Sequence, residues 1–138
     1  FPECWASWGP QITYLLENGY RVAVPEMRGY GQSDAPEGVE AYDTVTLAGD
    51  VAGLIDAYDQ GPAVVIGHDW GCIVAWHTAW LHPNKLAGVG GLSVPWFGRG
   101  EMPLLPVVEQ LYPDNYIYLS DFQRQETQDE NNESDPDQ

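Results

Sequence analysis

The hydrophobic pattern of the chain changes repeatedly between helix-like and strand-like as far as Pro95. Apolar residues recur at helical spacing in three segments, and we predict helices over 5–18, 44–58 and 70–81. Short β-branched or fully apolar runs predict strands over 20–25, 63–66 and 86–94. Strands that alternate with single helices are typical of parallel strands joined by right-handed crossovers. The pattern therefore predicts an α/β fold with a doubly wound, mostly parallel sheet, whose binding sites lie at the carboxyl ends of the strands.

Local signals mark the ends of the predicted helices. Gly19 stops the first helix, and either Asp43 or Thr44 can cap the start of the second. Gly61 and Pro62 then separate the second helix from the apolar strand that follows it.

The alternation ends after Pro95, where prolines and tyrosines become frequent and acidic residues later dominate. This change predicts three regions: a core, the start of an inserted lid, and a solvated tail without fixed structure. Their predicted bounds are 1–97, 98–120 and 121–138. A large α/β fold with a lid needs roughly twice the length of this chain, so we expect the fold to be partial.

Composition narrows the classes of function. The chain has 21 acidic residues against 5 basic ones and a formal charge of −16, a surface that repels nucleic-acid phosphates and anionic lipids. No apolar run approaches the ~20 residues of a membrane span. Cys4 and Cys72 are too few for a disulfide framework or a metal site. We therefore expect a globular protein of a reducing, cytoplasmic compartment, with neither nucleic acid nor membrane as partner and no metal.

The segment Gly67-His68-Asp69-Trp70-Gly71 follows the buried strand and opens a helix. This context is that of a nucleophile elbow, in which glycines flank a strained residue whose side chain projects into the cleft. We predict that both glycines are needed for steric reasons and that Asp69 is the nucleophile. The alternative from the local pattern is that Asp69 only caps the helix.

A carboxylate nucleophile indicates the kind of reaction. It displaces at sp³ carbon and leaves an ester that water must cleave, so the substrates implied are epoxides or alkyl halides. The helix N-terminus favours the ionised carboxylate, and the Trp70 N–H is the natural donor to the oxyanion formed later. Neither step requires a cofactor.

Several motifs make the chain, over about residues 1–123, resemble the epoxide hydrolases of the α/β-hydrolase superfamily. The resemblance implies a partial α/β-hydrolase fold that opens epoxides with water, and an oxyanion hole formed by the N–H groups of Trp70 and Phe1. The motifs are Phe1-Pro2-Glu3 with Trp5 and Trp8, Met27-Arg28-Gly29-Tyr30-Gly31 with Ser33-Asp34-Ala35-Pro36, the elbow, and Leu92-Ser93-Val94-Pro95.

The same resemblance gives a role to Tyr118, which lies where the family places one of two lid tyrosines. An epoxide opens to an alkoxide, and a phenol with a pKa near ~10 can supply a proton as the C–O bond breaks. Tyr112 and Tyr116 are close by in sequence, and a tyrosine that only packs is the alternative.

Two other groups of enzymes share parts of the elbow. Haloalkane dehalogenases use side-chain N–H donors for the departing halide, and the phenyl ring of Phe1 offers none. Fluoroacetate dehalogenases usually carry Arg where Trp70 stands. The resemblance therefore favours an epoxide as substrate and keeps a dehalogenase as the alternative.

No residue of the chain matches the family's base histidine or its acidic partner. His68, His77 and His82 are assigned to packing or capping, because each is fixed in the elbow or along the helix that follows it. A truncated, inactive homologue is therefore a further alternative.

Overall fold

The structure, a computed structural model, describes residues 3–98, 100 and 103–122. The chain divides into two compact units, Phe1–Trp96 and Phe97–Gln138, and each is described by itself. Phe1 and most of the predicted acidic tail, from residue 123 onward, lie outside the described residues.

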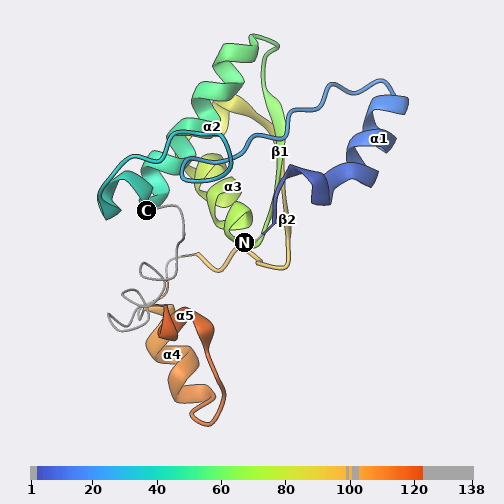
Figure 1. Ribbon diagram of the computed structural model, residues 1–138. Coiled ribbons are helices and arrows are strands. Elements are labelled where there is room, and N and C mark those ends of the chain that lie inside the picture. The colour runs from blue at the N-terminus through green and yellow to red at the C-terminus, as the bar shows by residue number, and fades with distance from the viewer. Residues whose placement is uncertain (1–2, 99, 101–102, 123–138) are drawn as a thin grey trace. The chain divides into compact units, whose positions relative to one another are not determined.

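The first unit contains a parallel pair of strands joined by a helical crossover. Strand β1 (Ala63–His68) pairs in parallel with β2 (Leu86–Leu92). Between them run α3 (Trp70–Leu81) and the short 3₁₀ helix η3 (Pro83–Lys85). Helix α3 packs against both strands (Figure 1). The predicted parallel α/β arrangement is confirmed for this pair.

The core of the first unit lies where α2 (Thr44–Tyr58) packs on α3. Both helices have the bounds that the periodicity predicted. The start of α2 is capped by Asp43, whose Oδ1 accepts the Thr46 N–H at 2.6 Å. The buried residues are small or medium-sized, which lets the helices approach closely: Leu47, Ala48, Ala52, Cys72, Val74, Ala75 and Thr78.

The predicted first helix is two elements rather than one. A 3₁₀ helix, η1 (Trp5–Trp8), precedes α1 (Gly9–Glu17). Pro10 has no N–H to donate to the preceding turn, so the α-helical pattern begins around it. Residues ahead of the proline adopt the tighter 3₁₀ turn instead.

The prediction of a strand over 20–25 is wrong. Val22 and Val24 are half-buried while their neighbours are exposed, so the alternation typical of a strand is present. A strand also needs a partner backbone, and in the described part of the chain the sheet contains β1 and β2 alone. The local sequence predicts the alternation of buried and exposed residues, but it does not show whether another strand pairs with this segment.

The loop that follows is fastened to α2 by Arg28. Its Nε and Nη2 donate to the two carboxylate oxygens of Asp50, each at 2.6 Å, and its Nη1 donates to the Ala41 carbonyl at 2.8 Å. Ala41 lies in the short 3₁₀ helix η2 (Val39–Tyr42). The Met-Arg-Gly-Tyr-Gly motif is thus an anchor for the loop that carries it.

The second unit contains α4 (Leu104–Leu111) and α5 (Tyr118–Asp121). Pro106 lies within the first turn of α4, where its missing N–H removes no helical hydrogen bond. The frequent prolines of this region are therefore compatible with helix.

Candidate active site

Asp69 occupies the sharp turn between the end of β1 and the start of α3. Its backbone has φ 53° and ψ −122°, a combination that non-glycine residues adopt at a cost of about 1–3 kcal/mol. A residue that only caps a helix has extended backbone angles, as Asp43 does with φ −68° and ψ 157°. Asp69 stands at the N-cap position of α3, but its conformation is that of an elbow.

The two glycines of the elbow differ in what they permit. A Cβ added at Gly67 would overlap the backbone of Gly71 and Cys72, so only glycine fits where β1 meets α3. A Cβ at Gly71 meets no described atom within 4 Å. The steric requirement predicted for both glycines is therefore found at Gly67 and not at Gly71.

The backbone of the elbow is joined to the end of β2. The Asp69 N–H donates to the Leu92 carbonyl and to the Ser93 Oγ, both at 3.3 Å. His68 and Leu92 are partners in the parallel register, so the carboxyl ends of the two strands lie side by side. Asp69 therefore stands at the edge where sheets of this class bind their ligands.

The Asp69 carboxylate lies against the first N–H of α3. Its Oδ2 accepts the Trp70 N–H at 2.6 Å. Burial raises the pKa of the Asp69 carboxyl. Groups that lower this pKa include the Trp70 N–H, which donates to the carboxylate, and the neighbouring His68. The lowering effects outweigh burial, so the pKa lies below its ordinary value. The lowered pKa favours the ionised carboxylate at neutral pH.

The Trp70 N–H lies beside the Asp69 side chain. It donates to the Asp69 carboxylate, and the indole side chain of Trp70 is 45% exposed at the surface of the unit. A backbone N–H in this place can donate to negative charge on an adjacent oxygen. Phe1, the predicted second donor, lies outside the described residues.

The histidines have structural contacts. His68 Nδ1 lies 3.5 Å from Glu3 Oε2, which links the start of the described chain to the elbow. His77 Nδ1 lies 2.7 Å from the Ile73 carbonyl oxygen, and its ring meets those of Trp80 and Trp96 edge to face. His82 follows the last residue of α3. These contacts agree with the predicted roles in packing and capping.

Tyr118 belongs to the second unit, where it begins α5. Its side chain is 44% exposed and its ring meets that of Phe122 edge to face. Within the described part of the chain, no residue hydrogen-bonds its hydroxyl. The Tyr116 hydroxyl, in contrast, donates to Asp121 Oδ2 at 3.0 Å.

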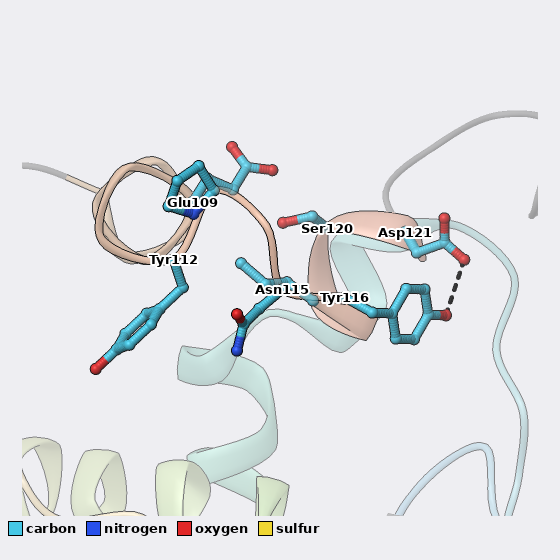
Figure 2. A pocket seen from close by; sticks show the side chains of 8 residues that line it. Glu109, Tyr112, Asn115, Tyr116, Ser120 and Asp121 are labelled. Atoms are coloured by element: carbon cyan, nitrogen blue, oxygen red, sulfur yellow. Dashed lines mark hydrogen bonds between the residues drawn. The ribbon is translucent and has the colours of Figure 1, made fainter.

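The same unit has a surface hollow of about 320 Å³ that contains no elbow residue (Figure 2). It combines carboxylate, phenol and amide side chains, and its lining residues are Glu109, Tyr112, Pro113, Asn115, Tyr116, Ile117, Ser120 and Asp121. Tyr112 and Tyr116 line this hollow and Tyr118 does not. The structure therefore gives Tyr118 different surroundings from the other two tyrosines, a difference that the sequence does not show.

The described residues contain neither a metal-binding cluster nor a membrane-spanning helix. No group of three or more His, Cys, Asp or Glu side chains in those ranges could hold a metal ion. None of the described helices is both long and apolar enough to cross a lipid bilayer.

Sequence reasoning missed the part played by the end of β2. Ser93 was quoted only as part of a motif, yet its Oγ contacts the backbone of Asp69. Cys72 and Trp76 have no predicted role at the site, yet the thiol of Cys72 contacts the Leu92 carbonyl and the indole N–H of Trp76 donates to the Val94 carbonyl, on either side of Ser93. The register that brings these residues together depends on strand pairing, for which the sequence has no local signal.

A family model for the alpha/beta hydrolase fold matches residues 1–130. The chain therefore belongs to the α/β-hydrolase fold family. It is 47% identical over 122 residues to epoxide hydrolase B of Mycobacterium tuberculosis, a match that covers 87% of this chain and 34% of that protein.

Solved structures show the same relationship. Epoxide hydrolase A from Mycobacterium thermoresistibile aligns with a TM-score of 0.83 and 44% identity, over 91% of this chain and 40% of that one. An epoxide hydrolase from an endophytic Streptomyces aligns with a TM-score of 0.87 and 36% identity, over 98% and 41% of the two chains. The predicted resemblance to epoxide hydrolases and the predicted fold class are confirmed.

The match covers only part of each relative. The chain spans 34% and 38% of the lengths of epoxide hydrolases B and A of Mycobacterium tuberculosis.

Proposed function

We propose that this chain belongs to a hydrolase that opens epoxides to vicinal diols, with Asp69 as the nucleophile. An Asp69 carboxylate oxygen attacks an epoxide carbon, the C–O bond to the ring oxygen breaks, and Tyr118 gives that oxygen a proton. Water then attacks the carboxyl carbon of the ester, and the Trp70 N–H, with that of Phe1, stabilises the oxyanion. As the C–O bond to the substrate breaks, one proton of that water goes to the departing diol oxygen and the other returns to the Tyr118 phenolate, which regenerates the Asp69 carboxylate and the phenol.

The observation that carries the proposal is an aspartate, rather than a serine, in the strained backbone of the elbow. An ester of Asp69 forms only by attack on sp³ carbon with a strained or departing group. The relatives named as epoxide hydrolases favour the epoxide. No base for the second step is assigned, because His68 and His77 have structural contacts.

The partners and surroundings follow from the same chemistry. We propose a small epoxide and water as the reactants, with no cofactor, nucleic acid or metal. Cys4 and Cys72 are both unpaired thiols, which supports a reducing compartment such as the cytoplasm.

Trapping the ester tests the first half of the reaction on the chain as it exists. The chain is incubated with 1,2-epoxyhexane, digested, and searched by mass spectrometry for the adduct on the peptide that contains Asp69. We expect that adduct in the wild type and not in Asp69→Asn, whose amide is a poor nucleophile. The exposed thiol of Cys4 serves as an internal control for the reactivity of the epoxide.

The competing functions predict other results. A dehalogenase would form the Asp69 ester faster from 1-bromohexane, with release of bromide, than from the epoxide. An inactive homologue would form it from neither compound. Adducts at Cys4 without any at Asp69 would overturn the proposal.

A further inference from the structure

The chain leaves β2 through a strained residue that faces the elbow. Ser93 has φ 79°, in the left-handed region that favours glycine. Besides Ser93, only Asp59 and Asp69 share a positive φ among the described non-glycine residues. Two of these three therefore lie at adjacent strand ends, since Asp69 follows β1 and Ser93 follows β2.

Helix α3 holds the backbone on both sides of Ser93. The Cys72 thiol lies within hydrogen-bonding distance of two carbonyl oxygens, that of Leu92 at 2.8 Å and that of Gly67 at 3.0 Å. The Trp76 indole N–H donates to the Val94 carbonyl at 2.9 Å. A Cβ at Gly91 would lie 2.5 Å from the Trp76 ring, so the indole also fits closely against the strand. A strained conformation persists where its surroundings determine it in this way.

The Ser93 hydroxyl contacts the backbone of Asp69. Its Oγ accepts the Asp69 N–H at 3.3 Å, and the Leu92 carbonyl accepts the same N–H at 3.3 Å. The Asp69 N–H is thus shared between two acceptors at the end of β2, and the Asp69 carboxylate accepts a hydrogen bond from the Trp70 N–H. These contacts fix the elbow on two sides.

We propose that Ser93 is a positioning residue for the Asp69 nucleophile. Its hydroxyl, held in place by Cys72 and Trp76 through the strained end of β2, keeps the elbow backbone in the conformation that aims the carboxylate at the substrate. This inference rests on the proposed function, because it gives Ser93 its effect through attack by Asp69. Nucleophilic attack is sensitive to such alignment, so loss of the hydroxyl lowers the rate of attack rather than binding.

Ser93→Gly separates the hydroxyl from the strain. Glycine adopts a positive φ without steric cost, so this variant keeps or gains stability while it loses the hydrogen bond. Ser93→Ala loses the hydroxyl and keeps the strain. The matched control is Asp59→Gly, which relieves a positive φ of 46° at the end of α2.

The experiment measures the rate of Asp69 ester formation as a function of 1,2-epoxyhexane concentration, together with thermal unfolding. We expect Ser93→Gly and Ser93→Ala to lower the maximal rate roughly three- to tenfold, the size of one neutral hydrogen bond, at an unchanged half-saturating concentration. Asp59→Gly should react at the wild-type rate, and Ser93→Gly should unfold no earlier than the wild type.

Each other result has one meaning. A Ser93→Gly variant that reacts at the wild-type rate overturns the positioning role and shows that only the conformation matters. A change confined to the half-saturating concentration also overturns it. Failure of the wild type to form the ester contradicts the proposed function instead.

Discussion

The two glycines of the elbow provide a test at the scale of single residues. We expect Gly67→Ala to destabilise the chain by about 1–3 kcal/mol, because its Cβ overlaps the first turn of α3. Gly71→Ala should be neutral or stabilising by up to about 1 kcal/mol, because it adds no clash and alanine favours helix. Urea unfolding followed by circular dichroism measures both. Equal destabilisation by the two variants would show that the close contact at Gly67 is not the reason why glycine is required there.

The sequence has a local signal for the unusual position of Asp69 but none for the conformation of Ser93. Asp69 is recognisable because its side chain is unusual between two glycines after an apolar strand. The left-handed backbone of Ser93 has no such signal, since serine is common in every kind of turn. Its neighbours Leu92 and Val94 are contacted by Cys72 and Trp76, which belong to α3 and are distant from Ser93 in sequence.

At the scale of elements, the start of α2 depends on a charged cap. The Thr46 backbone N–H, and then its hydroxyl, lower the pKa of the Asp43 carboxyl. A group with a lowered pKa in the folded state adds stability above its unfolded pKa and loses that contribution as the pH falls through the folded pKa. The advantage that ionised Asp43 gives α2 is therefore present at neutral pH and disappears in acid.

We expect Asp43→Asn to remain folded, because the amide oxygen can still accept from Thr46. Its melting temperature should lie below that of the wild type at neutral pH, and the difference should shrink as the pH falls below the ordinary pKa of aspartate. Asp43→Ala should lose the cap at every pH. Thermal unfolding across this range measures the three proteins, and a difference between wild type and Asp43→Asn that grows in acid would contradict the assignment.

The helices and strands also show which parts of the fold can be predicted from local sequence. Helices α2 and α3 have the predicted bounds because their periodicity and end signals are contained within each segment. The segment 20–25 has the alternation of a strand, yet Val22 and Val24 pair with no described strand. Pro10 lies where the first predicted helix divides into two elements. This proline is a local signal, but the helical spacing of the apolar residues around it predicts one continuous helix.

At the scale of the molecule, the sheet of the first unit leaves an apolar face exposed. Val64 is 63% exposed and Ile66 52%, and both point to the same side of β1. Their partners on β2 are Gly88 and Gly90, which contribute no side chains to cover them. Exposed apolar side chains on a flat strand surface favour association between molecules.

We therefore expect the 138-residue chain to self-associate as its concentration rises, and the double variant Val64→Thr/Ile66→Thr to do so less. Threonine keeps the β-branched shape that suits a strand, so these exposed changes should alter stability by only about 0.5 kcal/mol each. Sedimentation velocity over a range of concentrations measures the association. Val39→Thr is the matched control, because Val39 is 90% exposed but lies in η2, away from the sheet. If the double variant associates as strongly as the wild type, the contact lies elsewhere on the chain and the glycine-lined face of the sheet is not its cause.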